Sequence, residues 1–600
     1  MTFPSRPGSS GSRALPAIAA VVAGIVLIAL VRFFTGGGDD GAPSAAPGEG
    51  TTAESACEGA ATELVLAVSP EKTQILTEIA QEYARTDGES SAGCVDVTVS
   101  EKSSGAAQVA LARGWNDATD GPRPDVWSPS SSSWPGLLSD ALRTQDKPTL
   151  VPDGELPSLV RTPLVIAMPQ PMAEVLGWPA KQPGWSDLLA LTKDPRGWGA
   201  LGHPEFGPFR LGKTNPELST SGLHALVGAN FAATGLSSDL TATNINDPKV
   251  RAYVGGIEQA AVHYGPTTLT FLANQAKADR EGRGLAYVSA IAVEEKSLLD
   301  YNRGDASVGG NGKPPQIRLA AIYPKEGTVF SDNPYITLTA DWVDANKQAA
   351  AADFLAYATS PESQRRFTDI GFRGSDGKPG ALVTLKNGAL PDQPKVELSP
   401  PAPPVLALIR DSWKELRKKA RVLFVIDRSG SMQADNRIGL ARDAAAKAFG
   451  GFGPADQVGL VTFSSDYRVD VPIGPIQSSL KPLQDAAQGL FPDGGTALYA
   501  STRKAHQQMQ REFQPGLINA VVVMTDGRND DPDADLDRLL ADLRPSEDTA
   551  RTVRVFTVAF GADAGLDELK KIAEASTGAA YDARKETSIE KVLSDVVSNF

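Results

Sequence analysis

The stretch VLFVIDRSGSM, Val422 to Met432, is an apolar run that stops at an aspartate and continues with two serines. An unbroken apolar run of this kind is typical of a strand that is buried on both faces of a sheet. Asp427, Ser429 and Ser431 follow directly, at the strand end where sheets of this kind bind their ligands. The stretch therefore predicts an α/β fold with an oxygen-rich site at the end of a buried strand.

The sequence around this stretch alternates between two patterns from residue 418 to residue 600. Four β-branched or apolar runs are separated by segments with helical spacing of apolar residues: RVLFVID, QVGLVTFSS, LINAVVVMTD and VRVFTVAFG. This alternation predicts a mostly parallel, doubly wound sheet with helices on both faces. The segment YRVDVPIG is expected to add a short antiparallel strand at the edge of that sheet.

Two further polar residues fall at predicted strand ends or tight loops of the same region. Thr496 lies in the glycine loop PDGGTAL, and Asp526 ends the run VVVMTD. Together with Asp427 and the two serines they offer oxygen ligands, with no cysteine or histidine nearby in sequence. Mg²⁺ and Mn²⁺ prefer such ligands, about six of them at roughly 2.0 to 2.2 Å. A plain turn is the alternative for DRSGSM, but the additional strand-end residues favour a metal site.

The motifs Asp427–Ser431, Gly494–Thr496 and Thr525–Gly527 resemble, in order, the metal-ion-dependent adhesion site of von Willebrand factor type A domains. The resemblance covers residues 418–600 and implies a Rossmann-like fold.

The same resemblance implies a role for each of the five side chains. Ser429, Ser431 and Thr496 are expected to bind the cation directly, and Asp427 and Asp526 directly or through water. An Asp or Glu of a partner protein is expected to complete the coordination. Because the hydroxyls are neutral, they leave the cation under-neutralised and attractive to that carboxylate.

The region 61–385 resembles the bacterial extracellular solute-binding proteins. Its opening segments TELVLAVSPEKTQILTEIAQEYART and RPDVWSPSSSSWPGLL carry the resemblance, and so does the stretch from Asn333 to Arg373. The resemblance implies a type II domain with two α/β lobes around a hinge, and a solute in the cleft between them.

Several hydroxyl residues of this region are candidates for binding a solute. They lie at predicted strand ends, on a glycine-flanked loop or in a strand that resembles the family: Ser69, Ser104, Ser128, Ser219, Ser221 and Tyr287. Hydroxyls and loop N–H groups suit an oxyanion or a sugar. Ordinary loop serines remain an equal alternative.

The N-terminal region predicts a membrane anchor. Residues 14–31 form an apolar stretch without charge, preceded by Arg6 and Arg13. The length suits a bilayer span, and the arginines favour a cytoplasmic tail. We expect a tail at 1–13, a transmembrane helix at 14–35 and a Gly/Ala/Pro/Ser-rich flexible linker at 36–60. This organisation predicts a single-pass protein of the cell membrane with its bulk outside the cytoplasm; later cleavage near residue 46 stays open.

The two cysteines, Cys57 and Cys94, both lie in the first part of the predicted exported region. Outside the cytoplasm a pair of cysteines is more often bridged than free. A disulfide between Cys57 and Cys94 is therefore expected.

A second compositional break separates the two predicted domains. The stretch from Leu390 to Leu406 contains six prolines, which disfavour helix and central strand. Residues 386–417 are therefore expected to form a Pro-rich linker.

Other activities find little support in the sequence. The net charge of −14 disfavours binding to nucleic acid, and the four histidines show no metal-ligand spacing. Gly207–Thr214 fits the written pattern of a phosphate-binding loop, but Asn215 and Pro216 follow where that loop needs a helix. No serine lies in a nucleophile elbow. These observations predict a protein that is not an enzyme.

The favoured function is a membrane-anchored, extracytoplasmic adhesion protein that engages an acidic residue of a protein partner through Mg²⁺ or Mn²⁺. The alternative is a solute-binding receptor of a transport system, in which the C-terminal domain serves as a docking module.

Overall fold

Three β-sheets organise the computed structural model, which describes residues 61–85, 89–90, 93–531, 535–545, 551–584 and 589–600. The predicted tail, transmembrane helix and flexible linker lie in residues 1–60, outside the described ones. Within the described ranges, no helix is long and apolar enough to cross a membrane.

The first lobe of the N-terminal domain is built on a sheet with the order β11-β4-β1-β3-β2. Its strands are β1 (Thr62–Val68), β2 (Glu89–Ser90), β3 (Gly93–Glu101), β4 (Val126–Ser128) and β11 (Ile336–Thr337). Strand β1 pairs in parallel with both β3 and β4. The helices of this lobe are α2 (Pro70–Arg85), α3 (Ser104–Arg113), α4 (Asp117–Asp120), α5 (Ser133–Thr144), α13 (Ala345–Ala358) and α14 (Pro361–Asp369).

The second lobe is built on a sheet with the order β10-β5-β8-β6-β7, in which β9 also pairs with β5. Its strands are β5 (Thr162–Pro169), β6 (Leu211–Thr214), β7 (Ala261–Gly265), β8 (Ala290–Glu294), β9 (Leu319–Ile322) and β10 (Phe330–Ser331). Its helices are α6 (Gln170–Val175), α7 (Trp185–Lys193), α8 (Thr220–Thr234), α9 (Ala242–Asn246), α10 (Pro248–Glu258), α11 (Thr268–Arg280) and α12 (Glu295–Arg303). Gly207–Thr214, which fits the written pattern of a phosphate-binding loop, ends in strand β6, and the next helix, α8, begins at Thr220.

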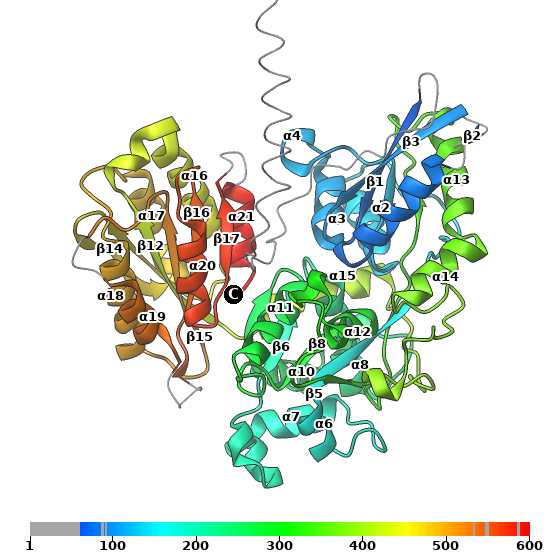
Figure 1. Ribbon diagram of the computed structural model, residues 1–600, viewed down its shortest axis with the longest axis horizontal. Helices are drawn as coiled ribbons and strands as arrows, with labels where there is room; N and C mark the ends of the chain where they lie inside the picture. Colours follow the sequence, from blue (N-terminus) through cyan, green and yellow to red (C-terminus); the bar gives the residue numbers. More distant parts are fainter. Residues whose placement is uncertain (1–60, 86–88, 91–92, 532–534, 546–550, 585–588) are drawn as a thin grey trace, which may run out of the picture. The chain divides into compact units, whose positions relative to one another are not determined.

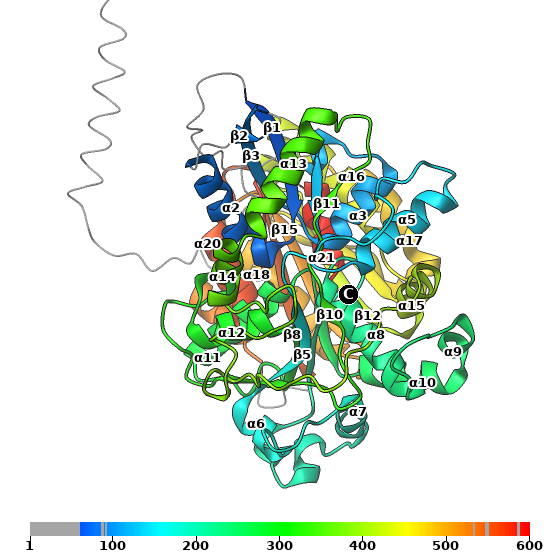
Figure 2. The same cartoon turned by 90° about the vertical axis from the view of Figure 1, so that its right-hand side faces the viewer.

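Two of the chain crossings between the lobes run from β4 to β5 and from β10 to β11 (Figure 2). Lys72, at the start of α2, binds both crossings: its Nζ donates to Pro129 O and to Asn333 Oδ1, each at 2.9 Å. Burial lowers the pKa of Lys72 to about 8. This arrangement agrees with the predicted two-lobed domain.

Helix α15 (Pro403–Leu416) corrects the expectation that residues 386–417 are a linker without helix. Prolines are tolerated in the first turn of a helix because the N–H groups there have no intrahelical acceptor, and α15 begins with Pro403 and Pro404. The helix buries Leu406, Ile409 and Trp413 and packs on α5 and α8. The proline-rich segment thus ends in a helix that belongs to the N-terminal domain.

The C-terminal domain is a six-stranded sheet with the order β14-β13-β12-β15-β16-β17 (Figure 1). Its strands are β12 (Ala420–Asp427), β13 (Gln457–Phe463), β14 (Tyr467–Pro475), β15 (Ile518–Thr525), β16 (Arg554–Phe560) and β17 (Ala580–Ala583). Only β14 runs antiparallel among these strands, and it lies at the edge as the YRVDVPIG pattern predicts. Its helices are α16 (Arg437–Phe449), α17 (Ile476–Gln488), α18 (Leu498–Arg511), α19 (Leu536–Leu543), α20 (Leu566–Ala575) and α21 (Ile589–Val597).

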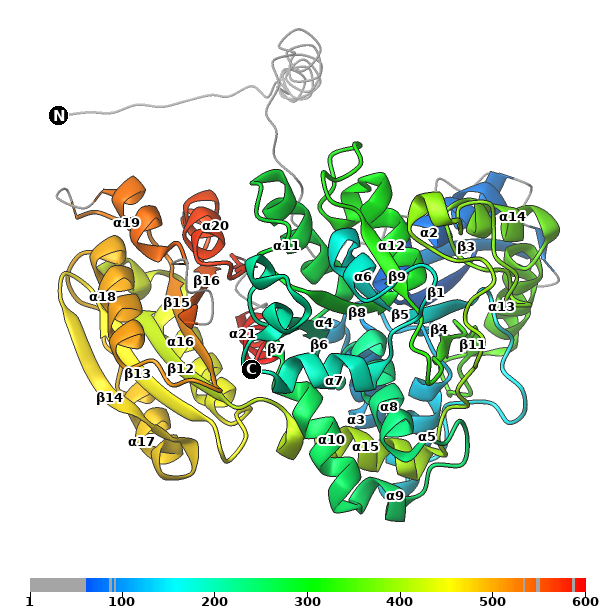
Figure 3. The same cartoon turned by 90° about the horizontal axis from the view of Figure 1, so that it is seen from below.

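Strand β12 is apolar from Val422 to Ile426 because helices cover both of its faces. Val422, Phe424 and Ile426 belong to the buried cluster that includes residues of α16, α17 and α21, whereas Leu423 and Val425 pack with α18, α19 and α20. Figure 3 shows α18, α19 and α20 on one side of the sheet and α17 on the other. The doubly wound fold predicted from the apolar runs is confirmed.

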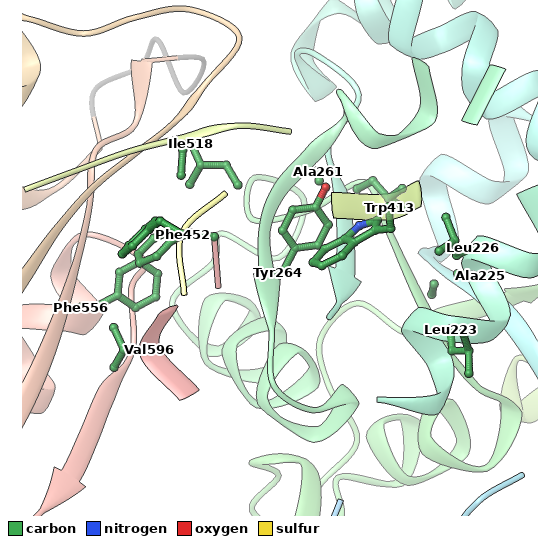
Figure 4. Close-up of a cluster of buried hydrophobic side chains, with 14 of the residues drawn as sticks. Leu223, Ala225, Leu226, Ala261, Tyr264, Trp413, Phe452, Ile518, Phe556 and Val596 are labelled. Carbon is green, nitrogen blue, oxygen red and sulfur yellow. The ribbon is translucent and has the colours of Figure 1, made fainter. Parts of the chain in front are cut away.

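The described residues from 61 to 600 belong to one compact unit, and buried side chains connect its two domains. Phe452, Phe556 and Val596 of the C-terminal domain belong to the same apolar cluster as Tyr264 and Trp413 (Figure 4). The Tyr264 and Trp413 rings meet edge to face with 5.0 Å between centroids. The Tyr264 backbone N–H donates to Asn599 O at 2.9 Å.

Candidate functional site

The predicted metal ligands meet where the strand order of the C-terminal sheet reverses. Strand β12 has β13 on one side and β15 on the other, and Asp427 ends β12 while Asp526 follows β15. Ligands of open parallel sheets bind at such a switch point, beyond the carboxyl ends of the strands. The sheet therefore places two carboxylates side by side although 98 residues lie between them in sequence.

Hydrogen bonds join four of the five predicted ligands into one chain. Ser429 Oγ lies 2.9 Å from Ser431 Oγ, which lies 2.7 Å from Asp526 Oδ1. The Ser429 backbone N–H donates to Asp427 Oδ1 at 2.7 Å, and the Thr525 hydroxyl donates to the other oxygen of that carboxylate. The oxygens predicted from the sequence thus converge within hydrogen-bonding distance.

Thr496, the fifth predicted ligand, lies beside the same group. A Cβ atom on Gly527 would lie 3.4 Å from Thr496 Oγ1 and 3.7 Å from Ser431 Oγ, so both hydroxyls flank that glycine. Asp530 fixes the loop, because its Oδ1 accepts from the Thr496 N–H at 2.7 Å. Thr496 and Ser429 are buried, whereas Ser431 is exposed, so the cluster opens to solvent on the Ser431 side.

The electrostatics of the cluster favour a cation. Asp427 is fully buried, and burial, helped by the neighbouring charge of Asp526, raises its pKa to about 6 against the lowering effect of its hydrogen bonds. Among the described residues no group of three or more His, Cys, Asp or Glu side chains could hold a metal ion. The cluster contains two carboxylates and three hydroxyls, which is a donor set that fits a hard divalent cation.

Arg437, at the start of α16, is a charged neighbour that the motif did not indicate. Its Nη1 lies 3.0 Å from Asp526 Oδ2, and its Nη2 lies 3.2 Å from Asp563 Oδ2. Arg437 is 5% exposed and Asp526 is fully buried, so the ion pair between these two residues is shielded from water. The Arg437 guanidinium group compensates the charge on Asp526 Oδ2, and Oδ1 of the same carboxylate accepts from the Ser431 hydroxyl.

A small pocket, of about 30 Å³, marks the cleft between the two lobes of the N-terminal domain. Ser104 and Ser219 line it, as expected for solute-binding residues. Ser69 donates to Glu71, which lines the pocket, at 2.5 Å, and Ser221 binds the pocket residue Thr268 at 2.7 Å. Four of the candidate serines therefore gather at the cleft.

Two other candidates do not reach this pocket. Ser128 is fully buried and its hydroxyl donates to Pro334 O at 2.8 Å, so it holds the crossing between the lobes. Tyr287 lines a different cavity and contacts His263 and Asn274. The position of a residue at the end of a strand does not determine where its side chain points or which cavity it lines. This explains why Ser128 and Tyr287 were expected at the cleft but do not line its pocket.

Two glutamates of the cleft were missed by sequence reasoning. Glu71, in the first turn of α2, accepts from Ser130 Oγ at 2.7 Å, and Glu294 accepts from Thr268 Oγ1 at 3.3 Å. Burial, with the charge of Glu71, raises the pKa of Glu294 to about 7. The pocket also receives the N-termini of α3, α8 and α11, and helix N-termini favour negative charge. The carboxylates of Glu71 and Glu294 therefore lie beside the helix N-termini, at the place where an oxyanion would otherwise bind.

Cys94 takes part in a disulfide bond. Its expected partner, Cys57, lies outside the described residues, so the pairing stays a prediction.

Two family models match the chain. The model described as bacterial extracellular solute-binding protein matches residues 64–373, more than half of the chain, and the model of the von Willebrand factor type A domain matches residues 422–595.

Similar proteins include an uncharacterized protein of Mycobacterium tuberculosis (strain ATCC 25618 / H37Rv), 26% identical over 597 residues, which are 98% of this chain and 82% of that protein. The inter-alpha-trypsin inhibitor heavy chain H4 of Sus scrofa is 27% identical over 173 residues, 28% of this chain and 18% of that protein. A solved von Willebrand factor type A structure from Catenulispora acidiphila is 21% identical, with a TM-score of 0.27, over 30% of this chain and 42% of that chain.

Proposed function

Since the chain belongs to the bacterial extracellular solute-binding proteins and carries a von Willebrand factor type A domain, we propose that it is a non-enzymatic adhesion protein. In this proposal it engages an Asp or Glu of a protein partner through a Mg²⁺ or Mn²⁺ ion. The stretch 14–31 anchors it in the cell membrane, with both domains outside the cytoplasm.

The convergence of Asp427, Ser429, Ser431, Thr496 and Asp526 at one sheet edge supports this proposal. The three hydroxyls and two carboxylates would hold the ion, which when bound supplies a positive charge for the partner carboxylate. Arg437 already neutralises part of Asp526, so the protein's own charges compensate the ion incompletely. Exposed Ser431 marks the side from which a partner can approach.

Affinity capture tests the proposed function directly. We expect the full-length chain, immobilised in the presence of Mg²⁺, to retain a protein from membrane extracts and to release it when EDTA is added. The Asp427→Ala variant serves as the matched control and should retain none of it. A partner that stays bound in EDTA, or that binds the variant equally, would contradict the metal-dependent contact.

A solute receptor of a transport system is the second candidate function, and the cleft pocket is the observation that favours it. The pocket is lined by side chains of both lobes, including Ser104 from the first and Thr268 from the second. Glu71 and Glu294 nevertheless add negative charge where an oxyanion would bind. If the domain still binds a solute, we propose that this solute is not an oxyanion.

We expect sulfate and molybdate to leave the thermal unfolding temperature of the natural chain unchanged at pH 8. Glu294 is ionised at that pH because its pKa is about 7, so both carboxylates repel the anion. The double variant E71Q/E294Q keeps the size of the side chains and removes their charge, and its unfolding temperature should rise with either anion. Stabilisation of the natural chain by these anions would favour an oxyanion receptor instead.

A further inference from the structure

A second cavity, of about 710 Å³, lies between the N-terminal domain and the C-terminal domain. Helix α11 borders it on one side and helix α20 on the other, and the two helices lie side by side in Figure 3. An ion pair between Lys277 of α11 and Glu574 of α20 joins the two walls. The cavity is separate from the metal cluster and from the cleft pocket, with which it shares no lining residue.

The lining of this cavity is strongly basic. Six basic side chains line it: Arg210, Lys277, Arg283, Arg544, Arg554 and Lys571. Among the described residues of the lining, Glu281 and Glu574 are the acidic ones, so these described residues carry a formal surplus of four positive charges. Both glutamates already form ion pairs, Glu574 with Lys277 and Glu281 with Arg283. Each glutamate therefore compensates the positive charge of the basic side chain with which it is paired.

Arg554, at the start of β16, carries a buried positive charge in this cavity. It is 8% exposed, its Nη1 donates to Val262 O at 3.3 Å, and its Nε has no hydrogen-bond partner. No acidic side chain of the described residues forms an ion pair with it within 4 Å. A buried charge without a counter-ion is costly, and an anion in the cavity would offset that cost.

The neighbours of Arg554 add to its positive field. Burial and the charge of Arg554 lower the pKa of Arg210 to about 10 and that of Lys418 to about 8. Three basic groups from both domains thus repel one another where the domains meet. An anion that binds here would relieve this repulsion and connect the domains.

We propose that this cavity binds a small molecule that carries several phosphate groups. Arginine guanidinium groups match phosphate oxygens in two-pronged, charge-assisted hydrogen bonds, and the cavity is large enough for a ligand of that size. A surplus of four positive charges fits a polyphosphate better than a single sulfate or carboxylate. A free polyphosphate and a phosphorylated lipid headgroup share this chemistry.

Calorimetric titration of the full chain in Mg²⁺-free buffer tests the proposal with tripolyphosphate and with the deacylated headgroup glycerophosphoinositol phosphate. We expect at least one of them to bind, and the tighter one identifies the source of the ligand. Arg554→Met should weaken that binding at least about tenfold, because it removes a positive charge and its charge-assisted hydrogen bonds to phosphate. Lys571→Met, at an exposed position of the rim, should weaken it without affecting folding.

Arg365→Met is the matched control. Arg365 lies on α14, its side chain is 68% exposed, and it does not line the cavity. This variant should bind tripolyphosphate as the natural chain does. If the natural chain binds neither probe, the proposal is overturned. It is also overturned if Arg554→Met and Lys571→Met bind the probe as tightly as the natural chain does.

Discussion

Replacement of Asp427 by alanine is expected to lower the Mg²⁺ affinity of the chain by about ten- to a hundredfold, the loss typical of removing groups that orient a metal ligand. Asp427 is fully buried, and its Oδ1 accepts from the Ser429 N–H at 2.7 Å. The variant therefore loses a carboxylate and also the contact that orients the neighbouring serine. Calorimetric titration of the full chain with Mg²⁺ and Mn²⁺ measures the loss.

Asp563→Asn is the matched control for this prediction. Asp563 is an acidic residue near the cluster, but its side chain is 80% exposed and contacts Arg437 rather than the hydroxyls. Its replacement should leave the Mg²⁺ affinity within a few-fold of the natural value. Thermal unfolding of both variants verifies that they fold. If a folded Asp427→Ala chain binds Mg²⁺ as the natural chain does, the assignment of the metal cluster is wrong.

Replacement of Glu258 by alanine is expected to destabilise the chain by roughly 3–5 kcal/mol, the usual cost of leaving a buried charge without its partner. The Glu258 carboxylate forms an ion pair with Lys213, accepts from Tyr264 Oη at 2.7 Å and accepts from Trp413 Nε1 at 3.3 Å. Lys213 and Glu258 are 1% and 0% exposed. Removal of the carboxylate would leave the Lys213 ammonium group buried and uncompensated.

Thermal or urea unfolding of three variants separates the causes of that loss. The double variant K213M/E258L removes both charges and should be markedly more stable than Glu258→Ala, since apolar replacements of a buried pair are often well tolerated. Glu258→Gln keeps polar atoms near Tyr264 and Trp413 and should fall between the two. An unfolding midpoint of Glu258→Ala equal to that of the natural chain would show that Lys213 finds another partner or loses its proton.

The central strands and the meeting of Asp427 with Asp526 beyond their ends could be predicted because local sequence determines them. Strands β12 and β15 are continuous apolar runs, and buried parallel strands need such runs. Asp427 and Asp526 stand directly at their ends, so parallel pairing alone brings them together. The position of Arg437 could not be predicted in the same way, because it begins helix α16 and no strand pairing fixes its distance from Asp526.

The N-terminal domain was harder to predict at the level of single residues. Glu71 has the sequence signature of an ordinary acidic residue in the first turn of a helix, and its role appears when the second lobe closes the pocket. Helix α15 was missed because the prolines at its first turn also fit a linker. In each case the deciding contact comes from a segment distant in sequence, which a local pattern does not contain.

The reversal of strand order beside β12 has a consequence for the order of folding. The oxygens at its tip come from segments near residues 427, 496 and 526, so β12 leaves the ribosome well before the last of them has been synthesised. Contacts over such sequence separations form slowly because loop closure costs entropy. A divalent ion can therefore slow the unfolding of the finished domain, but it has no complete binding place with which to accelerate the earliest steps.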